Sequence, residues 1–187
     1  MTTVLKVHLK DLNSQFIQDI QQKYGMAAEV EIHVYEQSSA DNLLSEAGFW
    51  QVIDSIDWSK NKTQDKLQPA ITMLSEMPVS HMYLFADKLS EKLFLLDTQK
   101  HAKVFSANEP EGYLSADDFL YARCAVVAEG KDFYEKVLND PSQMPDSIVF
   151  EPLLNLAHFA FKLKTGVEFN YRPAFNYETF SNKAGWN

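Results

Sequence analysis

The sequence predicts an α+β fold that is predominantly α-helical, with a small N-terminal β-α-β unit followed by a helical domain of about five helices. Residues 4–10 and 29–34 alternate between apolar and polar side chains with a period of two, which is typical of strands with one buried face. From residue 45 onward, apolar residues instead recur at intervals of three and four, which indicates amphipathic helices. We therefore expect two domains, residues 1–40 and residues 41–187.

The N-terminal unit is predicted to place one helix between its two strands. Asp11 or Asn13 can cap the start of this helix, and Gly25 is placed to end it. Its apolar stripe is formed by Phe16, Ile17, Ile20 and Tyr24. Two strands and one helix are only marginally stable in water, so another element must complete the sheet. The candidates are the helical domain, a second copy of the protein, and residues 167–171, which also alternate. We therefore expect either a monomer or a homodimer formed through the N-terminal unit.

The helical domain follows a polar stretch at residues 36–44 that is typical of a linker. Ser45 and Ser115 are placed to cap helices, Gly130 to break one, and Gly166 to end the last. The strongest helical periodicity is that of Met82, Phe85, Leu89, Leu93 and Leu96. The tail after Gly166 is rich in Tyr and Phe, so we expect it to pack against the domain.

Composition limits the function more than any motif does. The net charge of −9 and the isoelectric point near 5.0 are the opposite of what a protein that neutralises phosphates needs, so we expect no nucleic-acid partner. The lone cysteine, Cys124, cannot form an internal disulfide. The longest apolar run, residues 124–128, is too short to cross a membrane, and residues 1–6 do not resemble a secretion signal. We expect a cytoplasmic protein without a membrane partner.

The search for reactive groups predicts no catalytic residue, cofactor or metal. His8 and His33 point away from the apolar faces of their strands and could meet beside Glu29 and Glu31, as a divalent-metal site would require. A solvated polar sheet face explains the same pattern, and we expect no metal there. Cys124 lies among Ala and Val residues, so we expect it to be a small core residue.

Three separated motifs carry a resemblance to a known family. The first motif is Phe49-Trp50. The second is the run from Ser115 to Arg123, which begins Ser115-Ala116-Asp117-Asp118-Phe119. The third is Gly130-Lys131 with Tyr134, and Pro141 follows it. This combination, over residues 45–145, resembles a bacterial family that is catalogued only as domain of unknown function 4240. The resemblance implies an α-helical domain and assigns no activity.

Two interpretations of these motifs remain open. In the first they are structural: Ser115 caps a helix, Asp118 completes the cap, and Arg123 pairs with Asp118 or Glu91. In the second they line a binding cleft, whose residues would be Trp50, Asp117, Asp118, Arg123 and Tyr134.

Our leading hypothesis for function is a non-enzymatic protein-interaction module, for example an immunity-type inhibitor of a bacterial toxin. Its acidic surface would attract a basic protein partner. The alternative is an uncharacterised enzyme, a hydrolase or transferase, with a helical cleft around residues 117–123.

Overall fold

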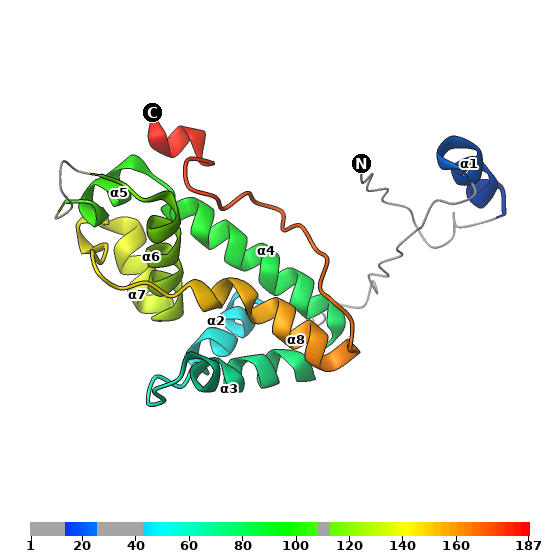
Figure 1. Cartoon of the computed structure of the whole chain (residues 1–187), viewed down its shortest axis with the longest axis horizontal. Coiled ribbons are helices and arrows are strands. Elements are labelled where there is room, and N and C mark those ends of the chain that lie inside the picture. The colour runs from blue at the N-terminus through cyan, green and yellow to red at the C-terminus, as the bar shows by residue number, and fades with distance from the viewer. Residues whose placement is uncertain (1–13, 26–42, 108–112) are drawn as a thin grey trace. The chain divides into compact units, whose positions relative to one another are not determined.

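A computed structural model describes residues 14–25, 43–107 and 113–187. The chain divides into two compact units, Met1–Ser39 and Ala40–Asn187. All regular structure among the described residues is helical (Figure 1), so the prediction of an α+β fold with a β-α-β unit is wrong and the fold is mostly α. Both predicted N-terminal strands lie outside the described residues, as do His8 and His33.

Residues 167–171, one of the candidates to complete the predicted sheet, show that an alternating pattern can occur without a strand. Residues 167–171 are extended chain and form no strand. Phe169 and Tyr171 both pack against Tyr83, with ring centroids 5.1 and 4.9 Å from the Tyr83 ring, while Asn170 between them is exposed. Any extended chain turns successive side chains to opposite sides, so a period of two reports extension and does not require a sheet.

The helix predicted in the N-terminal unit is confirmed. It is α1 (Ser14–Tyr24), and it ends at Gly25, whose φ of +89° lies in the region that favours glycine. The described part of this unit consists of this helix and Gly25.

The second unit contains more helices than the sequence predicts. Its α-helices among the described residues are α2 (Glu46–Asp54), α3 (Thr63–Glu76), α4 (Val79–Leu96), α5 (Gln99–Phe105), α6 (Ala116–Ala128), α7 (Lys131–Asn139) and α8 (Leu156–Thr165). Short 3-10 turns occur at Pro141–Gln143, Glu151–Asn155 and Lys183–Trp186. Helix α5 has no counterpart in the prediction, because seven residues are too few to establish a helical period.

Helix α4 is the centre of the unit and contacts α3, α6 and α8. Figure 1 shows it running between a group formed by α5, α6 and α7 and a group formed by α2, α3 and α8. The apolar stripe predicted from Met82 to Leu96 is buried along its whole length. Helix α6 is buried on nearly every side, and Cys124 within it is fully buried, which confirms its prediction as a core residue.

The predicted helix ends are also confirmed. The Ser45 hydroxyl accepts a hydrogen bond from the Gly48 amide at 2.9 Å, and the Ser115 hydroxyl accepts one from the Asp118 amide at 3.3 Å. Gly166 ends α8 with a φ of +74°. Within the described residues, no helix has the length and apolar character that crossing a membrane requires.

The tail packs as predicted, as an extended strap formed by residues 167–187. It runs beside α4 (Figure 1), and polar side chains of α4 bind its backbone. The Asp87 carboxylate accepts from the Ala174 amide at 2.7 Å. The Asp97 carboxylate, fully buried, accepts from the amides of Phe180 and Asn182 at 3.2 and 3.0 Å. The strap therefore satisfies polar groups in the interior of the unit, which makes it an integral part of the fold.

Candidate functional site

The five residues predicted to line one cleft are not brought together. Trp50 and Tyr134 do meet, with ring centroids 5.4 Å apart, and both are buried. Asp117 and Asp118 are exposed in the first turn of α6, where a negative charge interacts favourably with the helix dipole. Arg123 is fully buried in the same helix and binds the strap instead.

Arg123 joins α6, α4 and the strap. Its Nη1 donates to the carbonyl oxygens of Leu93 and Tyr177 at 2.8 and 3.1 Å, and its Nη2 donates to the Thr179 hydroxyl at 2.8 Å. Its Cζ lies 4.9 Å from the centroid of the Phe119 ring, a cation–π contact. The described residues contain no ion pair between Arg123 and Asp118 or Glu91, so the expected structural pairing is replaced by these neutral acceptors.

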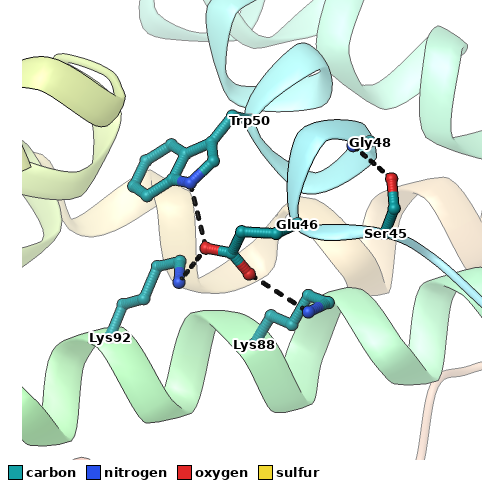
Figure 2. Close-up of polar contacts among 6 residues, drawn as sticks. All are labelled: Ser45, Glu46, Gly48, Trp50, Lys88 and Lys92. Carbon is teal, nitrogen blue, oxygen red and sulfur yellow. Dashed lines mark hydrogen bonds and ion pairs between the residues drawn. The ribbon is translucent and has the colours of Figure 1, made fainter.

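A second charged group, which the sequence did not predict, lies where α2, α4 and α7 meet. We call it the Glu46 junction; its residues are Glu46, Trp50, Lys88, Lys92 and Tyr134. Figure 2 shows three donors converging on the Glu46 carboxylate. Its Oε1 accepts from Trp50 Nε1 at 3.0 Å and pairs with Lys92 Nζ at 2.5 Å, and its Oε2 pairs with Lys88 Nζ at 3.1 Å.

Lys92 is the buried cation of this junction. Its side chain is only 8% exposed. Its Nζ lies 5.3, 5.1 and 5.5 Å from the ring centroids of Phe49, Trp50 and Tyr134, distances at which aromatic faces attract an ammonium group. The Tyr134 hydroxyl is also buried and has no hydrogen-bond partner among the described residues.

The surroundings of the junction shift the pKa values of Glu46 and Tyr134 in opposite directions. For Glu46, partial burial favours the neutral form, but hydrogen bonds from Lys92 and Lys88 outweigh it and lower the pKa of the carboxyl. For Tyr134, burial and the nearby Glu91 and Glu46 carboxylates raise the pKa of the phenol. Glu46 is therefore held as a carboxylate, and Tyr134 as a neutral donor.

An acidic corner lies at the turn between α6 and α7; we define it as Asp54, Glu129 and Asp132, all of them exposed. Gly130 shapes this turn with a φ of +98°, and a Cβ at this position would lie 3.1 Å from Asp54 Oδ1. Glycine thus allows both the turn and the close approach of the Asp54 carboxylate. Helix α7 carries two exposed bases, Lys131, which pairs with Glu135 at 3.6 Å, and Lys136.

Two further reactive side chains, Cys124 and His101, are buried. Burial raises the pKa of the Cys124 thiol to about 12, so it stays protonated at neutral pH. His101 Nε2 donates to the Val137 carbonyl at 3.0 Å, so Nδ1 accepts from the Thr98 hydroxyl at 2.7 Å in the neutral ring. Within the described residues, no group of three or more His, Cys, Asp or Glu side chains is placed to hold a metal ion.

A cavity of about 190 Å³ lies between α4, α8 and the strap. Its lining is mostly apolar and includes Leu89, Ala157, Phe169 and His158. His158 Nε2 lies 3.1 Å from the Glu168 carboxylate.

Sequence reasoning named Trp50 and Tyr134 but missed Glu46, Lys88 and Lys92. One signal was available. Lys92 falls three residues after Leu89 and four before Leu96, so it shares a helix face with the apolar stripe of α4. A lysine in phase with a buried stripe needs an anion, but the sequence does not say that Glu46 supplies it.

The chain folds into a helical domain, and two of the motifs found in the sequence meet where its helices pack, through the contact between Trp50 and Tyr134. The family model described as "Protein of unknown function (DUF4240)" matches residues 44–163, more than half of the chain, and the protein belongs to this family. The resemblance seen in the motifs is thereby confirmed. The match ends at residue 163, so the strap lies outside it. Neither the curated proteins nor the solved structures include a match to the chain.

Proposed function

We propose that the protein is a non-enzymatic protein-interaction module that binds a basic protein through its acidic corner. An immunity-type inhibitor of a bacterial toxin is the specific form of this proposal. Such an inhibitor would cover the basic cleft of its target with carboxylates, which also speeds association by electrostatic attraction.

The observation that carries the proposal is the separation of charge around α6 and α7. The three carboxylates of the acidic corner are exposed, whereas the only arginine of α6, Arg123, is fully buried. The exposed bases of α7 are Lys131, which is paired with Glu135 at 3.6 Å, and Lys136. The corner and α7 together therefore expose more carboxylates than bases beside a short turn, which suits recognition of a basic surface.

The enzyme alternative has less support. A cleft around residues 117–123 would need the carboxylates of α6 and the Arg123 guanidinium to face one substrate. Instead Asp117 and Asp118 face solvent, and the guanidinium is occupied by carbonyl and hydroxyl oxygens.

The test compares two variants of the full chain with equal net charge. One removes the corner charges (D54N/E129Q/D132N); the control removes three exposed carboxylates elsewhere (D65N/E76Q/E178Q). Each immobilised protein is exposed to lysate at about 0.05 M and about 0.5 M salt, since exposed charges are screened within about 10 Å at 0.1 M.

The proposal predicts a basic protein that the wild type and the control variant capture, that the corner variant loses, and that high salt releases. Identical capture by all three proteins, or equal losses from both variants, would contradict it.

A further inference from the structure

The Glu46 junction already shows how the molecule binds a carboxylate. Three donors from two helices converge on the two oxygens of Glu46, namely Trp50 Nε1, Lys92 Nζ and Lys88 Nζ (Figure 2). Two cations therefore face the Glu46 carboxylate directly, although the whole chain carries a net charge of −9.

The donors are held in place by the fold. Trp50 is buried in the core beside Phe49, and the Lys92 ammonium lies between three aromatic rings. A buried ammonium without an anion is strongly unfavourable, so a negative partner is favoured at this position. The core packing of Trp50 and Lys92, rather than Glu46, places these two donors.

The acceptor, in contrast, is not held by the fold. The Glu46 side chain is 50% exposed and is the first residue of α2. The start of this helix does not depend on it, because the Ser45 hydroxyl caps the helix by accepting from the Gly48 amide. Figure 2 shows this cap and the ion pairs as separate groups of contacts.

Tyr134 adds a further observation that points to a ligand. Its side chain is 4% exposed, and its hydroxyl has no partner among the described residues. A buried donor without a partner is uncommon in a folded protein and calls for an explanation. The ring of Tyr134 lies against both Trp50 and Lys92, so this unused donor belongs to the same junction.

We propose that Lys88, Lys92 and Trp50 form a binding site for a small mono- or dicarboxylate, which Glu46 fills from within when the ligand is absent. The incoming carboxylate takes the place of the Glu46 carboxylate, which swings into solvent. No covalent bond changes, and the two lysines keep an anion throughout. The site is independent of the acidic corner, which binds charge of the opposite sign.

The test follows the Trp50 indole N–H resonance of the full chain by NMR during titration with sodium succinate at constant ionic strength. The Trp58 and Trp186 resonances are internal controls. The wild type should show a saturable shift of Trp50 alone. Glu46→Ala should bind succinate at least about tenfold more tightly, because the internal competitor is gone. Adding Lys92→Met to Glu46→Ala should abolish the shift.

Each contrary result would overturn the proposal. These are a wild type that does not respond, equal affinities of the wild type and Glu46→Ala, or a shift that survives Lys92→Met. Tighter binding of inorganic phosphate than of succinate by Glu46→Ala would overturn the assignment to carboxylates. If Glu46→Ala does not fold, Glu46→Asp, which withdraws the carboxylate by one methylene group, takes its place with the same expectations.

Discussion

Two buried cations, Arg123 and Lys92, are balanced in different ways. Arg123 is surrounded by oxygens that belong to the chain's own interior, the carbonyls of Leu93 and Tyr177 and the hydroxyl of Thr179. Lys92 is balanced by one carboxylate on a half-exposed side chain, Glu46. The first arrangement cannot change without unfolding the strap, whereas the second can change by rotation of a single side chain.

The difference shows how a buried charge can be assigned a role. Arg123 satisfies acceptors that the fold has already placed, so its guanidinium acts as a structural link between α6, α4 and the strap. Lys92 is the fixed half of an ion pair whose other half is replaceable. The motif that carries the family resemblance includes Arg123, but the ligand site that we propose is the junction that contains Lys92.

The largest effect should come from Arg123→Met. It leaves the buried Leu93 carbonyl and two partly buried acceptors without their donor. An unsatisfied buried group costs about 1–3 kcal/mol and a partly buried one costs less, so the free energy of unfolding should fall by about 2–4 kcal/mol. Hydrogen exchange of the strap amides should accelerate. Arg123→Lys, whose single ammonium cannot reach all three acceptors, should restore less than half of the loss. A loss below about 1 kcal/mol in urea unfolding would show that Arg123 is not a structural link.

The next largest effect should be a difference in stability loss between variants of the two partners of the Lys92–Glu46 ion pair. Glu46→Ala strands a buried ammonium and should destabilise by about 1–3 kcal/mol, less than for a fully buried pair because solvent reaches the position. Lys92→Met strands only a half-exposed carboxylate that keeps Lys88, and should change stability by less than about 1 kcal/mol. The free energy of unfolding is measured in urea. Equal losses for Glu46→Ala and Lys92→Met would mean that neither partner is fixed by the fold.

His101 extends the comparison to a buried base that is neutral. Burial lowers its pKa from the ordinary value of 6.5, and the nearby Arg123 charge lowers it further, against the hydrogen bond to the Val137 carbonyl. The unfolded chain therefore takes up a proton below about pH 6.5 that the folded chain excludes. This contribution to stability is complete above pH 6.5 and is lost as the pH falls towards the folded pKa.

The check is urea unfolding between pH 7.5 and pH 5 for the wild type and His101→Gln. The wild type should lose more stability than the variant, with a difference in slope of at most about 1.4 kcal/mol per pH unit. Parallel pH profiles would show that His101 does not titrate differently on folding.

The smallest effects should come from the start of α6, where charge is exposed. Ser115→Ala removes the cap of the Asp118 amide and should cost about 0.5–2 kcal/mol. Asp118→Ala removes only a favourable interaction with the helix dipole and should cost about 0.3–1 kcal/mol. Thermal unfolding of both variants checks the order, and a larger loss for Asp118→Ala would show that its side chain makes a contact beyond the dipole.

The sequence predicts what depends on neighbouring residues. Ser45 and Ser115 mark helix starts, Gly25 and Gly166 mark helix ends, and the apolar stripe of α4 is visible as a period, because each signal lies within a few turns. The alternation of residues 167–171 is equally visible, but it is shared by strands and by any extended segment that packs on a helix. Only the tertiary structure distinguishes these cases. The α+β prediction rested on residues 4–10 and 29–34, which lie outside the described residues, and the all-helical structure of the described residues overturns it.

The candidate site was predictable only in part, for the same reason. Trp50 and Tyr134 were named from motifs, but Glu46 and Lys92 are separated by more than 40 residues and meet only when α2 packs on α4. The oxygens around Arg123 come partly from backbone carbonyls, which every residue carries and which no sequence pattern distinguishes.

The most direct test of the difference between the two cations is rescue by a small carboxylate. The free energy of unfolding of Glu46→Ala, Arg123→Met and the wild type is measured in succinate and in sodium chloride of equal ionic strength. At ten times the dissociation constant, succinate should stabilise Glu46→Ala by about 1.4 kcal/mol, and it should leave Arg123→Met no more stable than it leaves the wild type. Equal stabilisation of both variants, or none of Glu46→Ala, would contradict the account.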